Sequence, residues 1–216
     1  MKKKRNNNFL IILIIDFYNF YFKFFNNIRI DLLLRQKDEK KYLSHKKIRN
    51  LKHSTSLQTV WLLNLRRLYN IFKNSQDTNN YHFIDVGCGN GIPLIYAYKK
   101  LKFKSYVGFD LIKNYVDISK KNIISSIGVK NDIKIYNHDA CRYYLDTKKK
   151  YFVFMYNPFD EIILNKFIKN NLTNLTKNNS YLAYANLVEN SKINILKKYS
   201  KKFVKKKKYK IYLFKF

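Results

Sequence analysis

The stretch Phe83-Ile-Asp-Val-Gly-Cys-Gly-Asn-Gly-Ile-Pro93 decides the fold of this chain. Its apolar start predicts a buried strand over residues 81–86, and a helix is expected over 92–101. Three alternating glycines separate the two elements; glycine lets the backbone adopt a positive φ and lets a ligand approach without a Cβ in the way. The proline fits the first turn of the helix, where a missing N–H costs little. We therefore expect a tight loop and a helix N-terminus that face a ligand.

Strands and helices alternate through the rest of the chain. This alternation is typical of an α/β domain with a mainly parallel sheet, in which ligands bind at the carboxyl ends of the strands. Further strands are expected over 105–109, 133–136, 152–156, 181–185 and 209–216, and further helices over 114–127, 161–170 and 192–199.

Residues 1–80 carry no motif and are expected to form a helical extension that caps the domain of residues 81–216. Thr55-Ser-Leu-Gln58 fits a capping box, and apolar residues recur behind it at helical spacing as far as Phe72. Residues 9–34 predict an apolar helix. Its segment 9–25 is too short and too polar to span a membrane. Packing on the domain, an interfacial membrane helix and an export or anchor signal all stay open for it.

The net charge of +30 has two explanations. A basic surface attracts anionic partners such as nucleic acid or a membrane. Lys outnumbers Arg by 37 to 7, however, and its codons are rich in A and T, so genome bias also accounts for the charge. Arg is the better phosphate ligand because its planar fork binds bidentately. The Lys-rich segment 197–210 is therefore either a contact surface for RNA or anionic lipid or a solvated helix and loop.

The two cysteines and four histidines are scattered without metal-ligand spacing. Two cysteines are also too few for the disulfide framework of a small secreted chain. We expect no metal site, and a cytoplasmic protein for which peripheral membrane association through residues 9–25 stays open.

Acidic residues stand at the ends of the first two expected strands. A dinucleotide site prefers G-x-G-x-x-G, which requires glycine at position 92, where this chain has Ile92. The pattern here is Asp85-x-Gly-x-Gly-x-Gly91. Asp110 ends the second strand 19 residues after Gly91, and a carboxylate at that distance can accept hydrogen bonds from both ribose hydroxyls.

Two more polar motifs follow later strands. Asn137-His-Asp-Ala140 comes directly after the strand expected over 133–136. The segment Phe152-Val-Phe-Met-Tyr-Asn-Pro-Phe159 reads as a buried strand that ends in Asn, Pro and Phe. Since carboxyl ends of parallel strands share one edge of a sheet, both motifs are expected beside the glycine loop.

The glycine loop and these motifs resemble class I S-adenosylmethionine-dependent methyltransferases over roughly residues 81–216. The resemblance implies a Rossmann-like three-layer α/β sandwich with a mainly parallel sheet and a closing antiparallel hairpin that uses 181–185 and 209–216, plus the N-terminal helical extension. It also implies S-adenosylmethionine as cofactor, with Asp139 near the adenine amino group. The implied cofactor-binding residues are Asp85, Gly87, Gly89, Gly91, Asp110, Asp139 and Ala140.

Asn157, Pro158 and Phe159 are similar to the Asn-Pro-Pro-aromatic motif of amino-directed methyltransferases and to a shorter Asn-Pro-Phe version in small bacterial enzymes. This chain has one proline where the longer motif has two. The resemblance implies catalytic roles for all three residues: the Asn side chain and a backbone carbonyl accept hydrogen bonds from the target nitrogen, and the ring stacks on a planar target. For a hydroxyl target, His138 or Asp139 is the nearest candidate base.

The expected activity is methyl transfer by in-line displacement to a nitrogen or oxygen nucleophile on a small molecule, a protein or RNA. The protein mainly binds, orients and excludes water. The alternative is an RNA- or anionic-membrane-binding protein with a degenerate cofactor site, against which the intact glycines and Asp110 argue. A nicotinamide-dependent oxidoreductase is disfavoured by Ile92.

Overall fold

A seven-stranded sheet forms the centre of the fold in the computed structural model, which describes residues 3–28, 48–55 and 57–216. The strand order is β3-β2-β1-β4-β5-β7-β6. Strands β1 to β5 pair in parallel, whereas β7 is antiparallel to both β5 and β6. The predicted fold class is therefore confirmed. The strands are β1 (Tyr81–Val86), β2 (Ser105–Asp110), β3 (Ile133–Asn137), β4 (Lys150–Tyr156), β5 (Tyr181–Ala185), β6 (Lys202–Lys206) and β7 (Ile211–Lys215).

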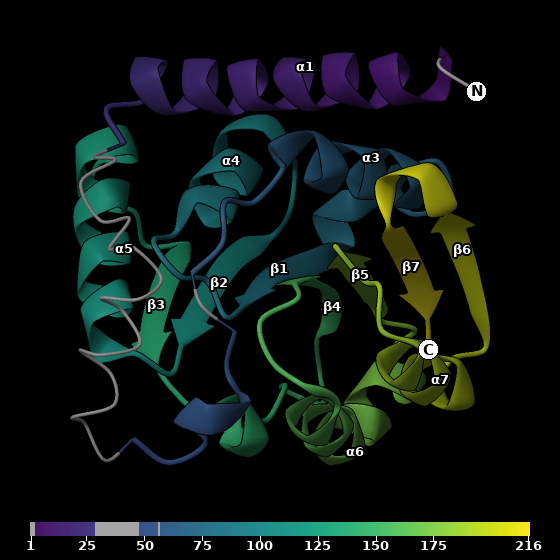
Figure 1. Cartoon of the computed structure of the whole chain (residues 1–216). Coiled ribbons are helices and arrows are strands. Elements are labelled where there is room, and N and C mark those ends of the chain that lie inside the picture. Colours follow the sequence, from purple (N-terminus) through teal and green to yellow (C-terminus); the bar gives the residue numbers. More distant parts are fainter. Residues whose placement is uncertain (1–2, 29–47, 56) are drawn as a thin grey trace.

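Helices cover both faces of this sheet (Figure 1). Helices α3, α4 and α5 lie on one face, and α6 and α7 lie on the other. Successive strand residues alternate between the two cores; Phe83 packs on the α3 and α4 side and Ile84 on the α6 side. The helices are α1 (Lys3–Phe25), α3 (Leu62–Lys73), α4 (Ile92–Lys100), α5 (Lys113–Ile127), α6 (Glu161–Lys177) and α7 (Asn190–Tyr199), with short 3-10 helices η1 (Leu51–His53), η2 (Thr78–Asn80), η3 (Ala140–Arg142) and η4 (Lys207–Tyr209).

Strand β6 is the element that the sequence pattern does not predict. All five of its residues are exposed, so it lacks the apolar alternation that marks a half-buried strand. It pairs with β7 at the edge of the sheet, where exposed lysines discourage pairing with other chains. The expected antiparallel pairing of β5 with β7 is present, and β6, inside the segment read as a basic helix and loop, completes the closing hairpin.

The capping box predicted at Thr55 is wrong. Helix α3 begins at Leu62, and its N-cap residue Trp61 makes no side-chain capping bond. The Thr55 hydroxyl instead donates to the main-chain oxygen of Asn157 at 2.7 Å. A long-range partner has therefore replaced the local helix cap; residue 56, inside the predicted box, lies outside the described residues.

Helix α1 lies across the outer side of α3 and α4 (Figure 1). Ile15 and Phe22 are buried against this layer. The Asn19 side chain accepts a hydrogen bond from the Leu62 main-chain N–H at 3.1 Å and donates to the Val60 carbonyl at 2.9 Å. Within the described ranges, no helix is long and apolar enough to cross a membrane. The end of the helix expected over 9–34, and most of the following loop, fall outside those ranges.

Candidate active site

A pocket opens at the carboxyl ends of the central parallel strands, where ligands bind in open α/β sheets. Its empty volume is about 820 Å³, part of which is open solvent, and this is within the usual size of small-molecule sites. Many of the residues predicted for the site line it: Gly87, Gly89, Asp110, Asp139, Ala140, Pro158 and Phe159. Asp85, Gly91 and Asn157 are not among the lining residues.

The glycine loop is packed against other segments of the chain. Gly87, Gly89 and Gly91 all have positive φ, as the sequence predicts. A Cβ on Gly91 would stand 2.2 Å from Ser119 Oγ, and one on Gly87 would stand 2.5 Å from Pro158 Cβ. Side chains at these positions would therefore both strain the backbone and push neighbouring segments apart.

Asp110 joins the glycine loop to the end of β2. Its Oδ2 accepts a hydrogen bond from the Gly89 N–H, and its Oδ1 accepts one from the Ile112 N–H, each at 2.9 Å. Asn137 holds the same turn, since its side chain donates to the carbonyls of Asp110 and Leu111 at 3.0 and 2.9 Å. The carboxylate is thus placed at the pocket wall with its orientation determined by backbone donors.

Asp85 is buried beneath the loop, with 2% of its surface exposed. Burial, and then the neighbouring Asp110 carboxylate, hold the pKa of Asp85 well above its usual range. Its Oδ2 has no hydrogen-bond partner among the described residues. A carboxyl in this setting favours its neutral, protonated form.

Asp139 lies on the far wall of the pocket, just before η3. Its Oδ1 accepts a hydrogen bond from the Cys141 N–H at 2.8 Å, which caps η3. Its Oδ2 accepts one from the Asn50 side chain at 2.7 Å. Asp139 therefore ties the segment before α3 to the end of β3, and Ala140 lines the pocket beside it.

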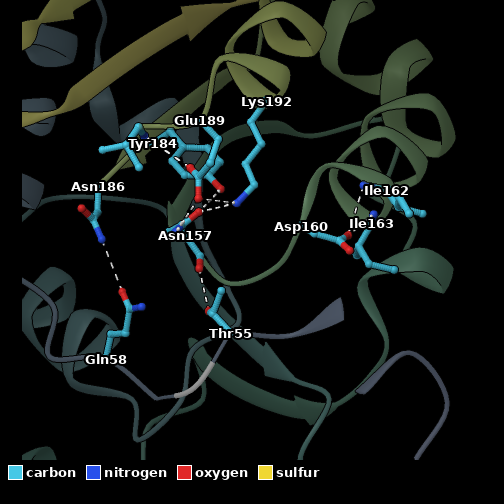
Figure 2. A network of polar contacts seen from close by, with 11 residues as sticks. Thr55, Gln58, Asn157, Asp160, Ile162, Ile163, Tyr184, Asn186, Glu189 and Lys192 are labelled. Carbon is cyan, nitrogen blue, oxygen red and sulfur yellow. Dashed lines mark hydrogen bonds and ion pairs between the residues drawn. The ribbon is translucent and has the colours of Figure 1, made fainter. Parts of the chain in front are cut away.

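The Asn157 side chain points into a polar cluster formed by Tyr184, Glu189 and Lys192 (Figure 2). Its Oδ1 accepts hydrogen bonds from Lys192 Nζ at 2.6 Å and from the Tyr184 hydroxyl at 3.1 Å. Its Nδ2 donates to Glu189 Oε1 at 3.4 Å. The backbone of Asn157 is in the left-handed region, with φ of 47°, and this turn presents Pro158 and Phe159 to the pocket.

The polar cluster is arranged to keep its hydroxyl neutral and its carboxylate ionised. Burial, and then the Glu189 carboxylate, raise the pKa of Tyr184. For Glu189 burial works against ionisation, but its own main-chain N–H and the Lys192 ammonium outweigh it and lower the pKa. Lys192 is 3% exposed and stands 3.3 Å from Glu189 Oε1. The sequence shows no signal for this cluster, because its members come from three different elements.

Ser54 and Thr55 line the pocket, and residues 53–55 pair with the loop after β4. Ser54 forms an antiparallel bridge with Phe159. The Thr55 N–H donates to the Pro158 carbonyl at 3.0 Å, and His53 Nδ1 lies 2.6 Å from Asp160 Oδ2. Sequence reasoning misses these residues because a short extended segment without a motif has no periodicity to detect.

The strand order and the glycine loop at the end of β1 define a class I, Rossmann-like methyltransferase fold. A family model described as ribosomal protein L11 methyltransferase (PrmA) matches residues 53–211. The chain belongs to this family and is therefore an S-adenosylmethionine-dependent methyltransferase. No curated protein matches the chain.

Solved structures at low sequence identity share the fold. A ribosomal protein L11 methylase from Lactobacillus delbrueckii subsp. bulgaricus is 15% identical, with 69% of this chain and 76% of that chain covered and a TM-score of 0.50. A SAM-dependent methyltransferase from Aquifex aeolicus is 17% identical, with 71% and 90% covered and a TM-score of 0.51. An RNA methyltransferase from Salinibacter ruber, in complex with S-adenosyl-L-homocysteine, is 14% identical, with 74% and 93% covered and a TM-score of 0.52.

The residues around the pocket fit S-adenosylmethionine. The glycines of the loop bring main chain to the pocket wall, and the carboxylate of Asp110 is a suitable acceptor for ribose hydroxyls. Apolar side chains such as Ile112 and Phe109 line the pocket beside these polar groups. A pocket that is mostly apolar with a few placed polar groups is the usual form of a cofactor site.

Proposed function

We propose that this methyltransferase modifies a nitrogen atom of a protein, and that ribosomal protein L11 is the first substrate to test. The observation that carries the proposal is the family match over residues 53–211, since the family is described by that substrate. The Asn157-Pro158-Phe159 loop at the pocket, similar to the motif of amino-directed enzymes, supports a nitrogen target. A small molecule, RNA or a hydroxyl acceptor are the other outcomes of the test.

On the cofactor side, we assign binding to the ends of β1, β2 and β3. Asp110 would accept the ribose hydroxyls, and Asp139 and Ala140 would meet the adenine. Asp85 and Gly91 do not line the pocket; we assign them to shaping the glycine loop that the cofactor contacts. The set is Asp85, Gly87, Gly89, Gly91, Asp110, Asp139 and Ala140. When bound, S-adenosylmethionine supplies an activated methyl group for in-line displacement, with its sulfur as the leaving atom.

On the acceptor side, Pro158 and Phe159 would contact the target. Asn157 Oδ1 already accepts two hydrogen bonds, from Lys192 and Tyr184, which fills its two lone pairs. In this arrangement we assign Asn157 to positioning the loop. The expectation that its side chain itself accepts the target N–H stays a prediction, and it requires that Lys192 or Tyr184 first release it.

The test is transfer of labelled methyl groups from S-adenosylmethionine to purified ribosomal protein L11, with purified ribosomal RNA and mixed ribosomal proteins in parallel. We expect label in L11, and its loss in Asp110→Ala. The matched control Asp132→Ala changes an exposed carboxylate outside the pocket and should leave the rate unchanged. Label in RNA alone, or in none of the three while the cofactor binds, would overturn the proposed substrate.

A further inference from the structure

Helix α1 carries a second apolar face that no described part of the chain covers. Its inner face packs on the domain through Ile15, Asn19 and Phe22. On the outer side the exposed fractions reach 69% for Phe17 and 65% for Phe24. The outer apolar residues recur at helical spacing and form a stripe that consists of Leu13, Phe17, Phe20, Tyr21, Phe24 and Phe25.

The rings of this outer stripe contact one another along the helix. Phe20 and Phe24 are stacked with centroids 6.1 Å apart, and Tyr21 and Phe25 are 4.4 Å apart. Asp16 is the one acidic residue in the sequence of the helix. A surface helix normally turns polar residues to solvent, and one that is apolar on both faces is normally buried on both. We therefore expect the outer stripe of α1 to be covered by an apolar partner.

Positive charge lies near one end of the stripe and on the layer beneath α1. Lys99 Nζ lies 2.5 Å from Asn26 Oδ1, just past the C-terminal end of α1. The basic η4 segment packs on α3, the helix beneath α1, since the Asn64 side chain donates to the Tyr209 carbonyl at 3.2 Å. An apolar stripe on a chain with a net charge of +30 is complementary to a surface that offers hydrocarbon and negative charge together.

We propose that α1 seats this protein on an anionic membrane surface, with the outer stripe in the boundary between headgroups and acyl chains. A second copy of the chain would supply an apolar partner, but it would bring another +30 charge against the first. An RNA would match the charge but not a contiguous apolar stripe. None of the described α1 side chains lines the active-site pocket, so the bound protein keeps its pocket free.

The experiment is flotation of the full-length protein with vesicles of phosphatidylcholine alone and of phosphatidylcholine with phosphatidylglycerol, at low and high salt. We expect binding to the phosphatidylglycerol vesicles that weakens with salt. The triple variant Phe17→Gln, Phe20→Gln, Phe24→Gln should reduce the partition coefficient at least about tenfold. The matched control Val129→Gln, Tyr144→Gln, Ile162→Gln removes three exposed apolar side chains elsewhere and should bind like the native chain.

Insertion is read out by Phe20→Trp, whose emission should shift to the blue and be quenched by brominated lipid. The native chain, which has Trp61 as its one tryptophan, reports the background. Equal vesicle binding by the triple variant, or no binding at low salt, would overturn the proposal. So would a dimer in sedimentation velocity, or RNA binding, that the triple variant abolishes. S-adenosylhomocysteine binding by every variant shows that each is folded.

Discussion

The ammonium group of Lys192 lies 2.6 Å from the side-chain oxygen of Asn157, although only 3% of Lys192 is exposed. A buried amine is tolerated only when hydrogen bonds and a counter-charge compensate its lost hydration. Asn157 and Glu189 provide both, at 2.6 and 3.3 Å. The contact ties α7 to the loop after β4, which carries Pro158 and Phe159 into the pocket.

We predict that Lys192→Met weakens the attachment of the loop after β4 to α7. The change removes the hydrogen bond from the Lys192 ammonium and leaves Asn157 Oδ1 with the Tyr184 hydroxyl as donor; a hydrogen bond to a charged group is worth about 1.5–3 kcal/mol. Methylation of the acceptor should fall through a higher KM, while calorimetric affinity for S-adenosylhomocysteine stays within about twofold. Lys198→Met, on the exposed side of the same helix, is the control. Equal effects of the two changes would contradict the assigned role.

We predict that Gly91→Ala destabilises the protein mainly through Ser119. The new Cβ would stand 2.2 Å from Ser119 Oγ, in addition to the cost of a side chain at φ of 78°. That conformation alone costs roughly 1–2 kcal/mol. In a Ser119→Ala background the loss of unfolding free energy should shrink, because the nearest atom is gone. Urea denaturation of the four proteins gives the coupling energy; additive effects would contradict the packing described.

We predict that the effect of Asp85→Asn on the free energy of unfolding depends on pH. The folded-state pKa of Asp85 is raised above its usual 3.8, so between the two pKa values the folded state holds more protons than the unfolded state. Stability then falls as pH rises through this window. The unfolding free energy of Asp85→Asn relative to the native chain should therefore increase from pH 4 to pH 7. A difference that stays flat over this range would refute the raised pKa of Asp85.

We predict that Thr55→Val alters binding of the methyl acceptor and leaves binding of the cofactor unchanged. The substitution keeps the shape of the side chain and removes the 2.7 Å hydrogen bond from its hydroxyl to the Asn157 carbonyl, a bond worth roughly 1 kcal/mol. Acceptor KM should change severalfold, with cofactor affinity unchanged. Thr59→Val makes the same change at an exposed position four residues on and should have no effect on either constant.

The parts of the molecule that local patterns encode could be predicted, and those made by long-range pairing could not. The glycine loop could be predicted because positive φ favours glycine, and the positions of Asp110 and Asp139 follow from the ends of β2 and β3. The Lys192 cluster and the bridge from Ser54 to Phe159 join segments about a hundred residues apart or on different elements. Thr55 illustrates the difference, since its local pattern predicted a helix cap and its actual partner is Asn157.

The most direct test of the central claim is calorimetric titration of the native chain and of Asp110→Ala with S-adenosylmethionine and S-adenosylhomocysteine. We predict micromolar binding of both compounds by the native chain. In the variant, loss of a charge-assisted acceptor, worth about 1.5–3 kcal/mol, should weaken binding at least tenfold. Folded native protein that binds neither compound would contradict the claim that this pocket holds the cofactor. Equal binding by Asp110→Ala would contradict the role assigned to its carboxylate.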